Sequence, residues 1–234
     1  MSHVSRHTVV ITGAFGALGA AVARKFARGG SRLGLLDRAG VPDWASREFP
    51  APHVLVGGVD LADAAAAEAA VQKVQEAAGG LDVLINVAGG FRWQTLEGGD
   101  MATWELMFTM NLKTAVAVSR AALPHLVARG GGGIVNIGAG AAGRAAAGMG
   151  PYAASKAGVE RLTEALAEEV KDRNITVNAV LPGTLDTPAN RAAMPDADVT
   201  RWVHPDAVAD VVAFLASPEA RAVTGAAIRV FGRG

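Results

Sequence analysis

The chain has 234 residues, half of them apolar, and its 22 lysines and arginines balance 22 aspartates and glutamates. This length suits a single α/β domain over residues 1–234, with one buried core. A formal net charge of zero does not provide the basic surface that nucleic-acid or anionic-membrane partners require, so we expect a small-molecule partner. The chain has no cysteine, which excludes disulfides, thiolate nucleophiles and cysteine-bound zinc, and its five histidines show no metal-ligand spacing.

The sequence shows no sign of membrane insertion or export. No apolar run approaches the roughly 20 residues that span a bilayer. Residues 1–7 lack the apolar core of a signal peptide. We therefore expect a cytoplasmic protein.

Seven short apolar runs alternate with longer helix-compatible segments. The predicted strands are residues 8–12, 32–37, 53–57, 81–86, 133–137, 174–181 and 226–231. The predicted helices are residues 18–28, 62–78, 101–128, 152–172 and 205–216. This alternation predicts an α/β fold: a doubly wound, Rossmann-type parallel sheet of about seven strands with helices on both faces.

Two segments are too long to be simple connections, residues 138–150 and 182–203. Both follow predicted strands, so both lie at the carboxyl edge of the sheet, where ligands of such sheets bind. We expect the second segment, up to about residue 204, to be the substrate loop.

The first predicted strand runs into a glycine-containing turn and then a helix. Glycines at this place let backbone amides approach a pyrophosphate at the helix N-terminus. Glycines also serve ordinary turns, but the strand before and the helix after match the nucleotide-binding context. The residues predicted to contact the cofactor here are Thr12, Gly13, Phe15, Gly16, Ala17, Leu18 and Gly19.

Asp37 ends the second predicted strand, about 20 residues after the glycine turn. A carboxylate at this offset can accept hydrogen bonds from the adenosine ribose and repel a 2′-phosphate, which favours NAD(H) over NADP(H). The adjacent Arg38 can attract that phosphate instead, so NADP(H) stays open as the alternative.

The ends of the third and fourth predicted strands supply further candidates. Asp60 and Leu61 follow the third, and Asn86, Ala88 and Gly89 follow the fourth. At the carboxyl edge of the sheet these residues would flank the adenine and a ribose of the cofactor. Each is also of a type common in ordinary turns.

Tyr152 and Lys156 stand four residues apart at the start of a predicted helix, so their side chains project from one face. A cation there favours the phenolate, and we expect it to lower the tyrosine pKa from about 10. Such pairs on a helix are often only surface contacts, but Tyr152 is the sole tyrosine of the chain and follows a glycine-rich loop. We interpret the pair as catalytic.

These motifs resemble, in order and across nearly the whole chain, those of the short-chain dehydrogenase/reductase family. The resemblance implies that Tyr152 is the general acid, that Lys156 activates it, and that Asn111 holds a water beside the lysine. It also implies contacts to the nicotinamide end from a run after the sixth strand, namely Pro182, Gly183, Leu185 and Thr187.

The sequence departs from the family at the catalytic serine, where Ala139 stands before Gly140. Losing one such hydrogen-bond donor typically costs on the order of a hundredfold in rate. The serine-less turn, the Val87–Gly90 segment followed by an aromatic residue, and Met149 before Tyr152 look similar to the quinonoid dihydropteridine reductases. That branch of the family reduces a conjugated ring, for which the serine would be dispensable.

The preferred hypothesis is therefore an NADH-dependent reductase of a flat pterin- or quinone-like acceptor, with Phe91 and Trp93 stacking on the ring. Ala139, Gly140 and Met149 are the other predicted substrate contacts. One alternative is a ketoreductase or alcohol dehydrogenase that uses backbone amides near Gly140, and a second is a non-catalytic NAD(H)-binding protein. The resemblance further implies a homodimer or homotetramer.

Overall fold

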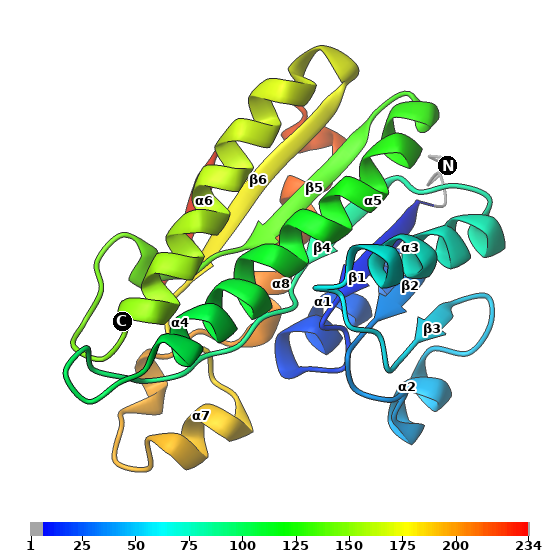
Figure 1. Ribbon diagram of the computed structural model, residues 1–234. Helices are drawn as coiled ribbons and strands as arrows, with labels where there is room; N and C mark the ends of the chain where they lie inside the picture. Colours follow the sequence, from blue (N-terminus) through cyan, green and yellow to red (C-terminus); the bar gives the residue numbers. More distant parts are fainter. Residues whose placement is uncertain (1–6, 234) are drawn as a thin grey trace.

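The computed structural model describes residues 7–233, which form a seven-stranded sheet flanked by helices (Figure 1). Every pair of neighbouring strands is parallel, and the strand order is β3-β2-β1-β4-β5-β6-β7. The predicted doubly wound α/β fold is thus confirmed. The strands are β1 (Thr8–Thr12), β2 (Arg32–Leu36), β3 (Val54–Val56), β4 (Val83–Asn86), β5 (Gly132–Ile137), β6 (Ile175–Pro182) and β7 (Ala227–Val230).

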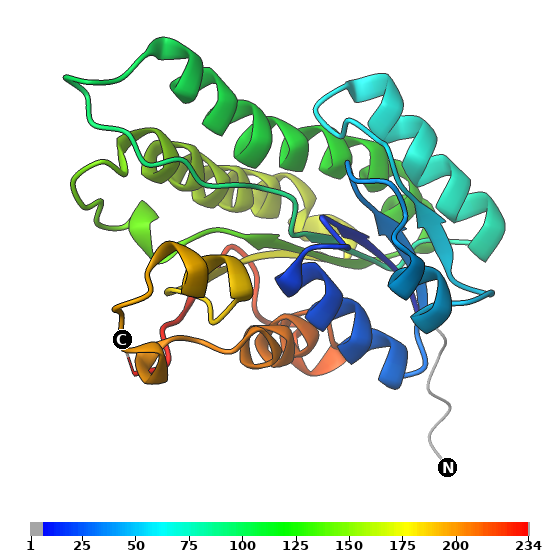
Figure 2. The same ribbon diagram turned by 90° about the horizontal axis from the view of Figure 1, so that it is seen from below.

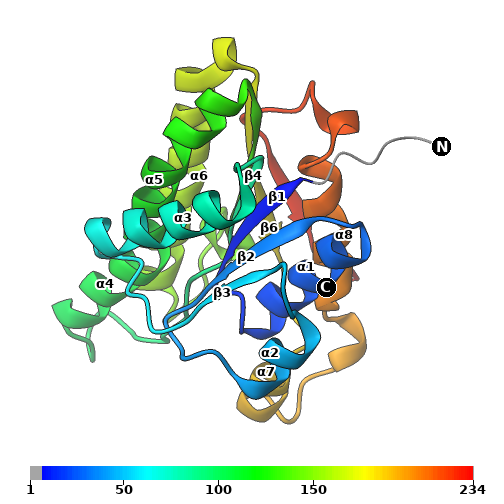
Figure 3. The same cartoon turned by 90° about the vertical axis from the view of Figure 1, so that its right-hand side faces the viewer.

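Two layers of helices enclose the sheet, as the views from below and from the side show (Figures 2 and 3). One layer contains α1 (Ala17–Arg28) and α8 (Pro205–Leu215), and the other contains α3 (Ala64–Ala78), α5 (Thr114–Arg129) and α6 (Gly150–Val170).

Alternate residues of each strand pack into opposite cores. Val9 and Ile11 of β1 lie in the core under α1 and α8, whereas Val10 lies in the core under α3 and α5. Burial on both faces explains why the strands read as continuous apolar runs.

The chain winds outward from β1 in both directions, because β1 lies between β2 and β4. At such a switch point the loops that follow neighbouring strands diverge and leave a crevice outside the carboxyl ends of the strands. Short helix α7 (Pro188–Ala193) lies at this edge, after β6. The fold therefore places both long loops of the sequence at one end of the sheet.

The structure departs from the predicted elements in two ways. The segment predicted as one helix over residues 101–128 consists of α4 (Met101–Met107), a π-helical segment, η1 (Phe108–Lys113), and α5. Two short helices were not predicted, α2 (Asp43–Glu48) and α7, because six residues give too little periodic pattern to recognise.

No helix among residues 7–233 is long and apolar enough to cross a membrane. The N-terminal segment in which the sequence shows no signal-peptide core lies, apart from His7, outside the described residues. The single domain predicted over residues 1–234 is likewise described only for residues 7–233.

Candidate active site

A cleft of about 1810 Å³ opens at the carboxyl edge of the sheet. Pockets for drug-sized ligands measure about 300–1,000 Å³, so this cleft has room for a dinucleotide and a substrate together. Thr12, Asn86, Trp93 and Asn111 do not line it. The predicted site residues that do line it are Gly13, Phe15, Gly16, Ala17, Leu18, Gly19, Asp37, Arg38, Asp60, Leu61, Ala88, Gly89, Phe91, Ala139, Gly140, Met149, Tyr152, Lys156, Pro182, Gly183, Leu185 and Thr187.

The glycines of the turn have two different structural roles. A Cβ atom on Gly13, whose φ is +61°, would lie 2.9 Å from the backbone of Ala88, and one on Gly19 would lie 2.1 Å from the carbonyl oxygen of Gly13. Gly16 is different, because its nearest neighbour would be 3.4 Å away and its surroundings are otherwise open. Two glycines thus allow close packing, and the third leaves the N-terminus of α1 accessible to a phosphate.

Asp37 lies just beyond β2 and faces the glycine turn. Its carboxylate accepts hydrogen bonds from the backbone amides of Phe15, at 2.8 Å, and Ala39, at 2.9 Å. The carboxylate therefore stabilises the turn in addition to lining the cleft. The exposed residue Arg38 lines the cleft beside it.

Two of the predicted cofactor residues support the site from behind. The Thr12 hydroxyl accepts hydrogen bonds from the amides of Val87 and Ala88, both at 3.0 Å, and so joins the ends of β1 and β4. The buried Asn86 amide donates to Ser119 Oγ and Asn136 Oδ1. Both residues fix the strand ends and do not line the cleft.

Asn111 also lies behind the cleft, in the π-helical segment. Its Oδ1 accepts a hydrogen bond from Gly90 N at 2.8 Å, and its Nδ2 donates to Gly90 O and to Ser155 Oγ. π-Helical segments often occur at functional sites, and this one points the asparagine at the loop that follows β4. In this structure Asn111 is a positioning residue for that loop.

Tyr152 and Lys156 lie one turn apart in α6, as predicted, and both line the cleft. The Lys156 side chain is buried, and its Nζ donates to Ile137 O at 2.7 Å. Burial lowers the pKa of Lys156 to about 8.

The expected lowering of the tyrosine pKa is wrong for this structure. Burial raises the pKa of Tyr152 to about 12, because desolvation disfavours the charged phenolate.

The serine-less turn faces the cleft next to these two residues. Ala139 is buried and precedes a 3₁₀ turn, η2 (Gly140–Ala142). The ring of Phe91 meets the ring of Tyr152 edge to face, with centroids 5.0 Å apart. Trp93, which was predicted to stack on the substrate, does not line the cleft, because its indole packs over Gly148 and donates to Ala147 O at 3.1 Å.

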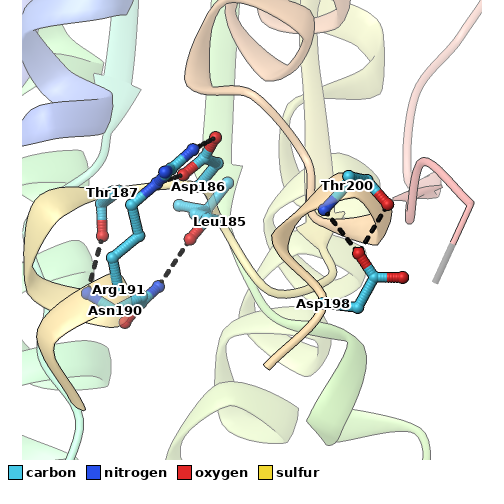
Figure 4. Close-up of polar contacts among 7 residues, drawn as sticks. All are labelled: Leu185, Asp186, Thr187, Asn190, Arg191, Asp198 and Thr200. Carbon is cyan, nitrogen blue, oxygen red and sulfur yellow. Dashed lines mark hydrogen bonds and ion pairs between the residues drawn. The ribbon is translucent and has the colours of Figure 1, made fainter. Parts of the chain in front are cut away.

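The predicted substrate loop leaves the sheet after β6, and backbone contacts join its two ends. A parallel bridge pairs Leu185 with Val203, and the Val203 amide donates to Thr184 O at 2.8 Å. Figure 4 shows the contacts that order the excursion, in which Thr187 caps α7 and Asn190 Nδ2 donates to Leu185 O. Arg191 forms a two-pronged ion pair with Asp186.

Sequence reasoning missed several lining residues. Phe231, after β7, lies beside Gly140 although 91 positions separate the two residues. No local pattern marks it as a site residue. The others that the sequence did not predict include Asn190, Met194, Asp198, Arg201 and Trp202 of the substrate loop.

Comparison with known proteins agrees with this geometry. A family model described as short chain dehydrogenase matches residues 7–198. An acetoacetyl-CoA reductase of Allochromatium vinosum is 29% identical over an alignment of 236 positions that covers 95% of this chain and 96% of the relative. A galactitol 2-dehydrogenase (L-tagatose-forming) of Cereibacter sphaeroides is 36% identical over 235 aligned positions, with 95% of this chain and 92% of the relative covered. A 3-oxoacyl-(acyl-carrier-protein) reductase of Thermotoga maritima is 36% identical over 170 aligned positions, with 69% of each chain covered.

The three relatives are named as reductases or dehydrogenases, and none is named as a dihydropteridine reductase. The narrower resemblance to that branch is therefore not supported, whereas the wider one is confirmed. Because the family model spans most of the sequence and the fold has the expected strand order, the chain is an oxidoreductase that belongs to the short-chain dehydrogenase/reductase family.

Proposed function

We propose that this protein is an NAD(P)(H)-dependent ketoreductase or alcohol dehydrogenase that interconverts a carbonyl compound and a secondary alcohol. The observation that carries the proposal is the placement of Tyr152 and Lys156 in the cleft whose wall also contains the glycine turn. The three relatives support it, since their names are those of reductases or dehydrogenases of this kind.

Tyr152 is suited to give a proton during carbonyl reduction. With a pKa of about 12 the phenol is neutral at pH 7, and its proton passes to the carbonyl oxygen as that oxygen gains negative charge. A bound nicotinamide would supply the hydride for the carbonyl carbon. Lys156, with a pKa of about 8, is mostly protonated at pH 7, and its charge counters the charge left on Tyr152.

The missing serine leaves the backbone as the second donor to the substrate oxygen. The first amides of a 3₁₀ turn have no carbonyl partner within it, and η2 begins at Gly140, directly after Ala139. We propose that the amides of Gly140 and Ala141, which line the cleft with Tyr152, stabilise the developing oxyanion.

A second candidate function is reduction of a conjugated pterin- or quinone-like ring. The buried methyl group of Ala139 favours it, because such an acceptor takes its proton on a ring atom and needs no serine hydroxyl. Ala139→Ser distinguishes the two functions. A ketoreductase should gain ketone turnover from the added hydroxyl, whereas a ring reductase should gain little and should reduce quinonoid dihydropterin.

Tyr152→Phe tests the mechanism. The variant keeps an aromatic ring against Phe91, so it should fold and bind NADH like the wild type. Its turnover of any accepted ketone should fall by 10²-fold or more, since proton transfer by a positioned group typically contributes 10²–10⁴-fold. Turnover equal to that of wild type would exclude Tyr152 as the proton donor.

We further propose that NADH is preferred over NADPH, because the carboxylate of Asp37 lines the cleft at the end of β2. Fluorescence titration with both cofactors measures the preference. Equal or reversed affinities would assign the adenosine end to Arg38, and Arg38→Ala should then weaken NADPH binding alone.

We also propose a homodimer or homotetramer. Exposed apolar side chains occur in α4, η1 and α5, namely Met101, Phe108, Val116 and Val127, and could form an interface between subunits. Light scattering on the purified protein gives the mass of the assembly.

We also propose that the chain folds as a single domain, which should unfold in one cooperative transition. The cytoplasmic location stays a prediction.

A further inference from the structure

Phe231 lies in the cleft although it belongs to the C-terminal end of the chain. It directly follows β7, the edge strand next to β6. Figure 2 shows the C-terminal end beside the segment of the substrate loop that follows α7. The side chain of Arg201 in that loop donates a hydrogen bond from Nε to Arg233 O at 3.3 Å, which joins the backbone after Phe231 to the loop.

The ring of Phe231 fills the space of a side chain at position 140. A Cβ atom built on Gly140 would lie 2.6 Å from Phe231 Cζ and 2.8 Å from Cε1. Gly140 is not among the residues with a positive φ, so its backbone does not require glycine. Space for the phenyl ring is therefore the reason that the structure gives for a glycine next to Ala139.

A second aromatic ring lies close to the reacting groups from another part of the chain. Phe91, in the loop after β4, packs edge to face on Tyr152. The residues that line the cleft thus include two phenylalanines, Ala139 and Met149. Rings and small apolar groups form flat walls, and offset or edge-to-face contacts with a bound ring add to the burial of its area.

We infer that Phe231 is a specificity-determining residue, and that the substrate is a ketone that bears a ring, aryl or alicyclic, next to the carbonyl group. This inference rests on the proposed function. In the reaction the carbonyl carbon gains a hydride from the reduced nicotinamide and the oxygen gains the proton of Tyr152, so the ketone is reduced to a secondary alcohol and the nicotinamide is oxidised. The ring of the substrate packs on Phe231 beside Gly140.

The test compares kcat/KM for acetophenone with kcat/KM for butanone in wild type and in Phe231→Ala. Wild type should prefer acetophenone, and the variant should lose about tenfold to a hundredfold of that preference, the range that one or two apolar contacts give. Phe214→Ala is the matched control, because Phe214 is a half-exposed phenylalanine of α8 outside the cleft, and its preference should equal that of wild type.

Gly140→Ala tests the pairing from the other side. Its methyl group must displace the Phe231 ring, so the single variant should also lose preference for acetophenone. In the double variant with Phe231→Ala the ring is already gone, and the second change should have little further effect. Additive losses would show that the two positions act separately and would overturn the pairing.

The outcomes distinguish a failure of the proposed ketone reduction from a failure of the role inferred for Phe231. Failure of wild type to reduce any ketone contradicts the proposed function itself. Ketone reduction with the same acetophenone-to-butanone ratio in wild type and in Phe231→Ala overturns the inference alone. If Phe231→Ala loses its fold or its NADH binding, Phe231→Leu, which keeps apolar volume without a flat ring, decides the question by the same ratio.

Discussion

Lys156 should make the unliganded protein more stable as the pH rises above 8. The folded protein holds this side chain almost completely buried, with a single hydrogen bond to Ile137 O. Its pKa is about 8 in the folded state and 10.5 when unperturbed. Between these two values the unfolded chain binds more protons than the folded one, so the free energy of unfolding increases with pH.

The size of the effect follows from the shift. One pKa unit corresponds to about 1.4 kcal/mol, so the burial of the charged lysine costs about 3 kcal/mol below pH 8, and this cost disappears by pH 10.5. Tyr152 has the opposite effect at higher pH. Its pKa rises from 10 to about 12 on folding, so its contribution decreases stability between pH 10 and 12.

Urea unfolding at pH 7, 8, 9 and 10 without cofactor, for wild type and Lys156→Met, measures this cost. Methionine keeps most of the apolar stem and cannot be charged, so wild type should gain about 2–3 kcal/mol relative to the variant between pH 7 and 10. Lys171→Met is the control, because Lys171 is exposed, is paired with Glu168 and has a raised pKa. Parallel pH profiles of the free energy of unfolding for wild type and Lys156→Met would show that burial of Lys156 does not cost stability below pH 8.

Two further predictions concern the residues that position the cleft. Asn111→Ala leaves the backbone of Gly90 without its partners, and we expect a loss of about 1–3 kcal/mol in urea unfolding together with weaker NADH binding by fluorescence; unchanged values for both would contradict the positioning role. Arg191→Gln breaks an exposed ion pair with Asp186, so the free energy of unfolding should change by less than about 1 kcal/mol. KM for the ketone should rise because the ion pair orders the substrate loop, and a large loss of stability would show that it supports more than this loop.

The sheet and the glycine turn could be predicted from the sequence because their signals are local. Strands buried on both faces are continuous apolar runs, and the turn has glycines between a strand and a helix. The pairing of Tyr152 with Lys156 is local as well, since four residues make one helical turn. These features predict the α/β fold and the proximity of Tyr152 and Lys156, and half of the residues that line the cleft were predicted from the sequence.

Features that depend on tertiary packing could not be predicted in the same way. The segment 101–113 contains neither proline nor glycine, so nothing marks the π-helical segment that directs Asn111 toward Gly90. The spacing of Tyr152 and Lys156 predicts that they are close, but burial determines whether the pKa of the tyrosine is raised or lowered. Trp93 follows a strand end like Phe91, yet its hydrogen bond to Ala147 O holds it outside the cleft.

The bridge between Leu185 and Val203 makes the segment between them an exchangeable module. Its two ends meet at one point beside β6, so an insertion or a graft beyond the bridge leaves the strand register and the start of α8 in place. Doubling the length of a flexible loop costs only about 0.6 kcal/mol in closure entropy. New substrate preferences can therefore arise in this scaffold by replacing the stretch of chain that follows Thr187, with Tyr152 and Lys156 untouched.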